Sequence, residues 1–158
     1  MLNKPVAFLC GIHTPLNTIS CPAHAFKHLR AGSQVSFSSY PGMLASTDDF
    51  YLTANKLVVT ETTLTIMDDN ALRRMTAEGV GSWMSTVVAS RLATSGEEWA
   101  ELFLANSAHT YSCQWLIMDY GRFKRGSVTQ NKGLFWILED VPGAFVSKDM
   151  TEQLLKQR

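Results

Sequence analysis

The chain has 158 residues, of which 46% are hydrophobic and 18% are charged, a composition typical of a globular domain with a packed core. Its 14 basic and 14 acidic residues cancel, which argues against a nucleic-acid-binding protein and against electrostatic attraction to an anionic membrane surface. No apolar run approaches the ~18 residues that a membrane-spanning helix needs, so no transmembrane segment is expected.

Residues 1–34 show no regular hydrophobic pattern, and their prolines exclude a long helix. Residues 6–12 form a short apolar run. This run favours a buried strand over a secretory signal peptide, since a signal would need a longer apolar region followed by small residues at a cleavage site. Residues 23–30 are compatible with a short helix.

The cysteines, Cys10, Cys21 and Cys113, form no CxxC motif and have no paired histidines beside them. Neither a disulfide framework nor a zinc site is therefore expected, although a single disulfide bridge stays open.

From residue 35 onwards the hydrophobic pattern becomes regular. Residues 35–38 alternate apolar and polar side chains, as a half-buried strand does. The segments 50–52 and 57–63 are rich in β-branched and aromatic residues and predict two strands, joined by a hairpin turn over 53–56. Further strands are predicted at 115–120, 134–139 and 144–146, with a solvated loop at 121–133 and a turn at 141–143.

Two helices are predicted between these groups of strands, and a third ends the chain. The first covers residues 81–92. It is predicted from five residues at helical spacing, which are Trp83, Val87, Val88, Arg91 and Leu92. The second follows Ser95, a suitable N-cap, and has two glutamates in its first turn, where the helix dipole favours negative charge. Its apolar stripe consists of Trp99, Leu102 and Phe103. Asp149 can cap the third helix, over 150–156.

Strands and helices come in blocks rather than in strict alternation, which favours an α+β fold with an antiparallel sheet. The residues alone indicate no chemistry, because the chain has no GxGxxG, Walker or HExxH motif. Ser38 and Ser39 lack the surroundings of a nucleophile elbow. Asp48 and Asp49 could act as paired carboxylates, but an exposed turn is the stronger interpretation.

Six blocks that follow one another along the chain are typical of a known family. They are FSSYPG at 37–42, DDFY at 48–51, ETT at 61–63, ASRLA at 89–93, TYSCQWLIMDY at 110–120 and LEDVPG at 138–143. Together they resemble the phospholipase B-like hydrolases of the N-terminal-nucleophile superfamily. The resemblance covers residues 35–158 and leaves residues 1–34 as a divergent N-terminal segment. It implies the central part of a phospholipase B-like domain, truncated at its C-terminus, and hence part of an αββα sandwich with mostly antiparallel sheet.

This resemblance implies hydrolysis of an acyl ester in a phospholipid, and so a role in lipid degradation. In such enzymes a cysteine freed by self-cleavage attacks the acyl carbon, and its new α-amine acts as the base. Neither a metal nor an organic cofactor is implied, and the implied location is lysosomal or extracellular. Two alternatives stay open: an amidase with the same nucleophile chemistry acting on N-acyl amides, and a non-catalytic vestigial or binding domain.

The resemblance also assigns candidate site residues. The threonine of ETT, which would help to hold the oxyanion, is Thr63, with Thr62 as the alternative because neighbouring strand residues point to opposite faces. The supporting histidine corresponds to His13, and Cys10, three residues earlier, is the candidate nucleophile. The family's asparagine and arginine would lie beyond residue 158. The chain by itself is therefore expected to be an incomplete or inactive fragment.

Two departures from the family pattern lie just before the 115–120 strand. Cys113 stands where relatives have asparagine and is interpreted as a small core residue. His109 stands near the place of a family glycine, and if that position needs a positive φ, the histidine is strained there.

Overall fold

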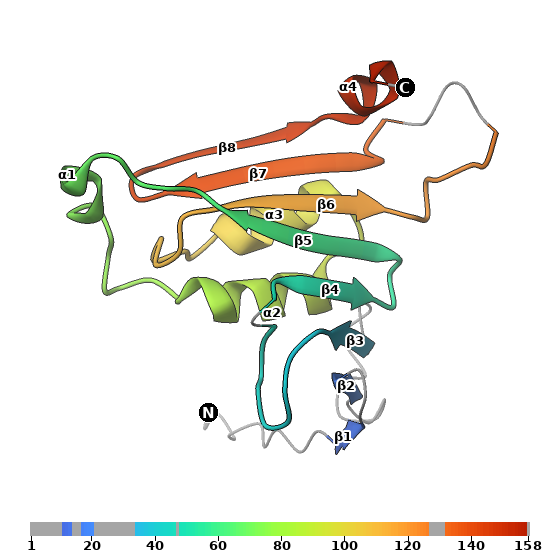
Figure 1. Cartoon of the computed structure of the whole chain (residues 1–158), viewed down its shortest axis with the longest axis horizontal. Coiled ribbons are helices and arrows are strands. Elements are labelled where there is room, and N and C mark those ends of the chain that lie inside the picture. The colour runs from blue at the N-terminus through green and yellow to red at the C-terminus, as the bar shows by residue number, and fades with distance from the viewer. Residues whose placement is uncertain (1–10, 14–16, 21–33, 47, 127–131, 158) are drawn as a thin grey trace, which may run out of the picture.

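The computed structural model describes residues 11–13, 17–20, 34–46, 48–126 and 132–157. These residues form one antiparallel sheet in which the strands are neighbours in chain order, from β1 to β8 (Figure 1). The strands are β1 (Gly11–His13), β2 (Asn17–Ser20), β3 (Gln34–Phe37), β4 (Phe50–Thr53), β5 (Leu57–Thr63), β6 (Cys113–Asp119), β7 (Phe135–Val141) and β8 (Ala144–Asp149). The α+β class with antiparallel sheet, predicted from the blocks of strands and helices, is confirmed.

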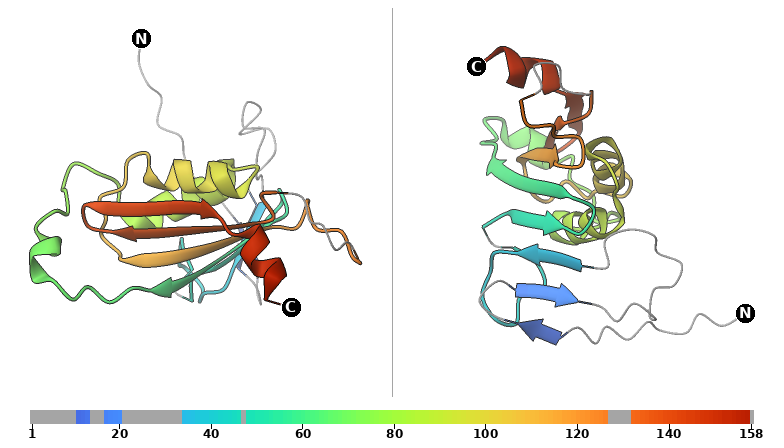
Figure 2. Two further views of the ribbon diagram at one scale, coloured as in Figure 1. Left: turned by 90° about the horizontal axis from the view of Figure 1, so that it is seen from above. Right: turned by 90° about the vertical axis from the view of Figure 1, so that its right-hand side faces the viewer.

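The connection between β5 and β6 carries three helices, α1 (Asp69–Leu72), α2 (Ser82–Leu92) and α3 (Gly96–Leu104), and α4 (Thr151–Lys156) follows β8. Figure 2 shows α2 and α3 side by side on one face of the sheet, while α4 lies at the β8 edge and projects towards the opposite face. We call these the helix face and the open face.

The core lies between α3 and the centre of the sheet. Along β6 the side chains alternate, so that Trp115 and Ile117 are buried on the helix face. Trp99 of α3 stacks on Phe103 with ring centroids 5.3 Å apart and meets Trp115 at 5.2 Å. Gly96 allows α3 to approach β7, because a Cβ there would lie only 2.6 Å from the Trp136 ring. The stripe of Trp99 and Phe103 is therefore the inner face of α3, as its spacing predicts.

The second helix on this face, α2, is oriented the other way. Its buried residues are Ser82, Ser85, Thr86, Ala89 and Ser90. Of the residues at helical spacing, Trp83 and Val88 lie on its outer side, 51% and 47% exposed, while Val87, Arg91 and Leu92 are half-buried. The buried hydroxyls have partners, since Thr86 Oγ1 donates to the Ser82 carbonyl at 2.9 Å and Ser90 Oγ accepts from Trp99 Nε1 at 3.1 Å. Burial of these polar groups is therefore compensated.

The other predicted elements agree closely with the structure. Ser95 is the N-cap of α3, and its hydroxyl accepts from the Glu98 amide. Asp149 Oδ1 accepts from the amide and the hydroxyl of Thr151, so it caps the chain entering α4 although the helix begins two residues later. The short helix α1, with Asp68 as its N-cap, and the strand β2 have no counterpart among the predicted elements. Residues 6–10 and the helix predicted over 23–30 lie outside the described residues.

Candidate active site

The ETT motif forms the C-terminal end of β5, so its side chains alternate between the two faces of the sheet. Thr63 pairs with Cys113 on the helix face, and Thr62 pairs with Gln114 on the open face. Both threonines are exposed. The side chains of the two candidate threonines therefore lie on opposite faces of the sheet, as predicted for neighbouring strand residues.

On the helix face, Thr63 belongs to a small polar cluster centred on the Tyr111 hydroxyl. Thr63 Oγ1 lies 2.8 Å from Tyr111 Oη. That oxygen also lies 3.3 Å from Glu61 Oε2 and 3.4 Å from Asp49 Oδ2. A phenol has only one proton to donate, so the contacts require a further proton, which Thr63 or one of the two carboxyl groups supplies. We call Asp49, Glu61, Thr63 and Tyr111 the carboxyl cluster.

The two carboxyl groups of the cluster favour protonation. Burial, followed by the charge of Asp49, raises the pKa of Glu61 to about 7. Burial likewise raises the pKa of Asp49. Since two neighbouring carboxylates repel each other, the pair tends to hold one proton in common at neutral pH. The cluster can thus accept or release a proton beside Thr63.

The backbone explains how Asp49 reaches this cluster. Its φ is +48°, a left-handed conformation that aspartate tolerates better than most residues, and its carbonyl accepts from the Glu61 amide at 3.1 Å. Asp48, next to it, is exposed. Asp48 and Asp49 therefore do not form a carboxylate pair, and Asp49 pairs with Glu61 instead. Asp49 lies in the loop before β4 and Glu61 lies in β5, so their spacing in the sequence gives no sign of the pair.

A second polar contact lies at the start of β6. His109 Nδ1 is 2.7 Å from Asp140 Oδ1, and the Asp140 side chain is fully buried. Burial raises the pKa of Asp140, and the contact with His109 opposes that shift. The φ of His109 is +53°, so the position does need the left-handed conformation that a glycine would adopt without strain. The contact of His109 with the buried Asp140 carboxylate thus offsets the conformational strain of the histidine backbone.

Cys113 is fully buried within the hydrophobic core, which confirms its interpretation as a core residue. Burial, together with the nearby charge of Asp140, raises the pKa of its thiol far above the ordinary value. A thiol that stays protonated is a poor nucleophile, so Cys113 supplies no nucleophile here.

The remaining candidates are not brought together with the threonines. The backbone of His13 lies in β1, which is separated from β5 by β2, β3 and β4, or roughly 19 Å at the usual spacing between strands. Cys10 lies outside the described residues. The structure therefore places Thr62 and Thr63 at one strand end and His13 on a distant strand.

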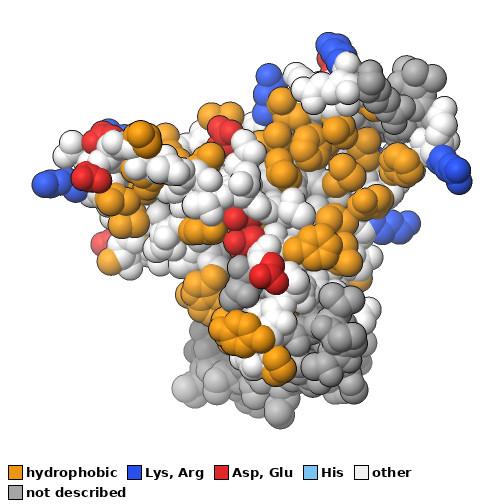
Figure 3. Space-filling model, viewed as in Figure 1, with side chains coloured by type: hydrophobic (Ala, Val, Ile, Leu, Met, Phe, Trp, Pro, Cys, Tyr) orange, Lys and Arg blue, Asp and Glu red, His pale blue; other side chains and the backbone are white. Residues whose placement is uncertain are grey.

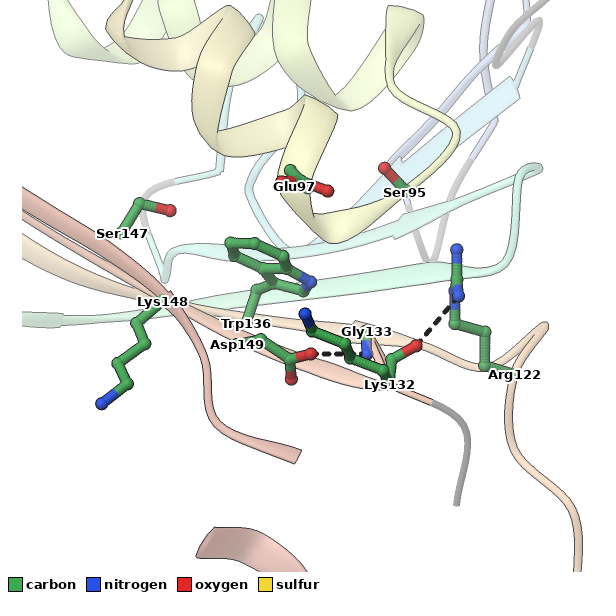
Figure 4. Close-up of a pocket in the computed structure, with 9 residues that line it drawn as sticks. All are labelled: Ser95, Glu97, Arg122, Lys132, Gly133, Trp136, Ser147, Lys148 and Asp149. Atoms are coloured by element: carbon green, nitrogen blue, oxygen red, sulfur yellow. Dashed lines mark hydrogen bonds between the residues drawn. The ribbon is translucent and has the colours of Figure 1, made fainter. Parts of the chain in front are cut away.

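A cavity of about 530 Å³ lies near the start of α3 (Figure 4). Two of its three basic side chains are already engaged or turned away. Arg122 Nε contacts Asp119 at 2.9 Å and its Nη1 donates to the Lys132 carbonyl, and Figure 4 shows Lys148 directed away from the other side chains. Asp149 accepts from the Gly133 amide at 2.8 Å. The described residues that line it include no cysteine and no histidine.

Within the described ranges, no group of three or more histidine, cysteine, aspartate or glutamate side chains is arranged to hold a metal ion. No helix in those ranges combines the length and apolar character needed to cross a bilayer.

Comparison with known proteins identifies the family. The phospholipase B family model matches residues 21–158. The chain is 44% identical over 121 residues to phospholipase B-like protein A of Dictyostelium discoideum, which covers 77% of this chain. It is 38% identical to putative phospholipase B-like 1 of Caenorhabditis elegans and 39% identical to putative phospholipase B-like 2 of Bos taurus, over 85% and 80% of this chain. The matched region spans only 21–24% of the length of these three relatives. The resemblance of the six sequence blocks is therefore confirmed, and the chain belongs to the phospholipase B family.

Proposed function

We propose that this chain is the central part of a phospholipase B-like acyl hydrolase that cleaves the ester bonds of phospholipids. The family match over residues 21–158 carries the proposal. The geometry of ETT supports it, because two exposed threonine hydroxyls stand at a strand end where one can stabilise an oxyanion formed by a nucleophile from another segment.

The open face supports the sandwich architecture that this function implies. Figure 3 views this face and shows hydrophobic side chains gathered across the strands. They include Leu52, 38% exposed, and Val146, 61% exposed, while Leu116 and Ile137 between them are half-buried. A sheet face with exposed aliphatic side chains favours packing against a second sheet at a distance of ~10 Å. That second sheet would complete the αββα arrangement.

In this arrangement Thr62 and Thr63 have different roles. Thr62 lies on the open face and would point between the two sheets, towards an incoming acyl group. Thr63 is held by Tyr111 on the helix face and would position the strand end. We keep both as candidates, together with Cys10 as nucleophile and His13 as its supporting histidine.

The complete gene product that carries this segment provides the test. Fatty-acid release from phosphatidylcholine and from an N-acyl amide should be measured side by side by mass spectrometry. Removal of one oxyanion donor costs about 10²–10³ in kcat, so Thr62→Val should lower kcat by that order if Thr62 is the donor, and Thr63→Val should do so if Thr63 is. Thr60→Val, two residues earlier on the open face of β5, is the matched control and should keep the wild-type rate.

The outcomes distinguish the ester hydrolase from the two alternatives, an amidase and a non-catalytic domain. Turnover of the phospholipid that depends on one of the two threonines supports the ester hydrolase. Turnover of the amide alone would favour the amidase instead. Absence of turnover of either substrate by a folded product would contradict the hydrolase and favour a vestigial or binding domain. Lysosomal or extracellular location, proposed on family grounds, is checked by imaging the tagged gene product.

A further inference from the structure

A row of polar side chains crosses the open face at the strand end that carries ETT. Thr62 of β5 is the register partner of Gln114 of β6, and Gln114 is in turn the partner of Glu139 of β7. These strands lie side by side in the sheet (Figure 1), so the β-carbons of neighbours in the row are about 5 Å apart. We call the three residues the open-face row. They come from three of the six sequence blocks, and the proposed reaction uses only Thr62.

The alternation of side chains along each strand places this row opposite the core. The strand neighbours of Gln114 and of Glu139 are buried on the helix face, whereas Gln114 and Glu139 themselves are half-buried. Thr62 is exposed. The row therefore faces the space between the two sheets of the proposed sandwich, the side from which Thr62 would meet an acyl group.

Glu139 fixes the orientation of the Gln114 amide. Gln114 Nε2 donates to Glu139 Oε1 at 2.6 Å, a short contact of the kind that charged acceptors form. Because a carboxylate can only accept hydrogen bonds, it holds the nitrogen of the amide, and not the oxygen, on its side. A primary amide has two N–H groups, and no further side-chain hydrogen bond joins Gln114 to a described residue. One N–H is therefore available to a ligand.

The hydroxyl of Thr62 is available in the same way. Thr63 Oγ1 is engaged with Tyr111 Oη at 2.8 Å, whereas the Thr62 hydroxyl forms no hydrogen bond within the described part of the chain. Two donors that share one oxyanion each lie about 2.7–3.1 Å from it, which places them within ~6 Å of each other. Register partners such as Thr62 and Gln114 are compatible with this spacing.

The residues beside the row strengthen hydrogen bonds to a negative charge. Leu116 and Ile137 are register partners that lie two residues from Gln114 and Glu139 along their strands, on the same face. Both are aliphatic and half-buried. An apolar neighbourhood lowers the local dielectric constant, so that a donor aimed at a developing charge stabilises it more than it would in water.

We propose that Gln114 is a second oxyanion donor beside Thr62 and that Glu139 is the positioning residue that directs its amide. The inference rests on the proposed function and deepens it, since it adds two residues to the same site. As the C–S bond forms, the thiol proton passes to the α-amine and the electron pair of the carbonyl π bond moves to the oxygen. The Thr62 hydroxyl and the second N–H of Gln114 hold that oxygen. When the C=O bond forms again, the leaving oxygen takes the proton from the α-ammonium.

The complete gene product provides the catalytic test, with the substrate that the wild type hydrolyses. Gln114→Met keeps the length of the side chain and removes both N–H groups, so kcat should fall about 10²–10³-fold, as it does when one oxyanion donor is lost. KM should change little, because the interaction is made only in the transition state. Gln34→Met, at an exposed strand position of β3, is the matched control and should keep the wild-type kcat. Equal kcat values for the two methionine variants would overturn the proposal.

Two variants of Glu139 test its role as an acceptor. Its negative charge by itself opposes an oxyanion, so the role depends on the accepted hydrogen bond and not on the charge. Glu139→Gln keeps an acceptor and should retain most of kcat, whereas Glu139→Leu releases the amide and should lower kcat roughly 10- to 100-fold. Adding Glu139→Leu to Gln114→Met should cause no further loss, because Glu139 acts through Gln114. Losses that multiply would contradict the positioning role.

Nuclear magnetic resonance of the 158-residue chain, labelled with ¹⁵N-glutamine, tests the orientation of the amide without any activity. The side-chain signals of Gln114 are identified by their absence in Gln114→Met. One of the two protons should lie downfield and exchange slowly, since it donates to Glu139 at 2.6 Å, and both features should vanish in Glu139→Leu. Near-ultraviolet circular dichroism shows that each variant is folded. Equal exchange of both protons in the wild type would overturn the positioning role.

The outcomes separate this inference from the proposed function. Turnover that Gln114→Met leaves unaltered would keep the hydrolase and overturn the second donor. A loss of kcat at constant KM would support both. Absence of turnover of either substrate by the folded wild type would contradict the hydrolase and the oxyanion role together, even where the amide signals show Gln114 held by Glu139.

Discussion

The two helices on the helix face, α2 and α3, bury opposite kinds of side chain. α3 packs large aromatic residues, Trp99 and Phe103, onto the sheet. α2 packs serines, a threonine and an alanine there and keeps Trp83 and Val88 on its outer side. Both helices lie on the same sheet. The difference therefore shows that hydrophobic periodicity identifies the apolar face of a helix but does not show whether that face packs on the sheet. The outer side of α2 remains suited to a further layer of protein.

The largest expected effect tests the aromatic contact of α3. Trp99→Ala removes a fully buried ring and the hydrogen bond to Ser90, so it should lower the free energy of unfolding of this chain by about 3–5 kcal/mol. Urea denaturation followed by circular dichroism measures the change. The same substitution on α2, Trp83→Ala, should shift the unfolding free energy by less than ~0.5 kcal/mol, because that ring is half exposed.

Equal losses for the two tryptophan variants would contradict the opposite orientation of the helices. A small loss for Trp83→Ala in this chain, together with a loss above ~2 kcal/mol in the complete gene product, would support the opposite orientation of the two helices. It would show that the rest of the protein covers the outer side of α2.

The next effect tests the close approach of α2. Ala89 is fully buried against the sheet, and Ala89→Leu would insert extra atoms where the packing leaves no space. Overpacking of this kind costs about 1–3 kcal/mol. Val88→Leu, one residue earlier and 47% exposed, is the matched control. A variant at Ala89 as stable as the one at Val88 in urea titration would show that the inner face is loosely packed.

Local signals in the sequence were sufficient for most elements of the fold. The alternation in β6 and the β-branched run of β5 predict strands because one face of each is buried. Ser95 predicts the start of α3, because its hydroxyl acts on an amide three residues away. Where a structure depends on contacts within a few residues, a single sequence contains the necessary information.

The orientation of α2 and the carboxyl cluster depend on distant contacts, and the sequence does not predict them. Trp83 and Val88 have the spacing of a core stripe, and only the arrangement of α2 on the sheet shows that they lie outside. Glu61 meets Asp49 and Tyr111 across loops and strands, so no motif marks the trio. Conversely, the family resemblance identified ETT although no physical signal in those residues alone indicates chemistry.

A smaller effect compares how the two helices begin. α3 is capped locally by Ser95, whereas the first amide of α2 is capped by Thr110 Oγ1 from a distant segment at 3.0 Å. Ser95→Ala should cost about 1 kcal/mol and increase amide hydrogen exchange in the first turn of α3 only. Thr110→Val should increase exchange at the start of α2 and leave α3 protected. Exchange spread over both helices in either variant would show that they unfold as one unit.

The smallest effect is the pH dependence contributed by the carboxyl cluster, which adjoins α2 and not α3. The folded-state pKa of Glu61 is raised from 4.5 to about 7, so the folded chain binds its proton more tightly than the unfolded chain does. This contribution favours folding below pH ~4.5 and is progressively lost as pH rises towards ~7. The groups of the cluster around Glu61, namely Asp49, Tyr111 and Thr63, stay in place in Glu61→Gln. The stability of wild type relative to Glu61→Gln should therefore fall across that interval in urea titrations. Glu97→Gln, an exposed glutamate on α3, should run parallel to wild type, and a parallel curve for Glu61→Gln as well would mean that the cluster holds no shared proton.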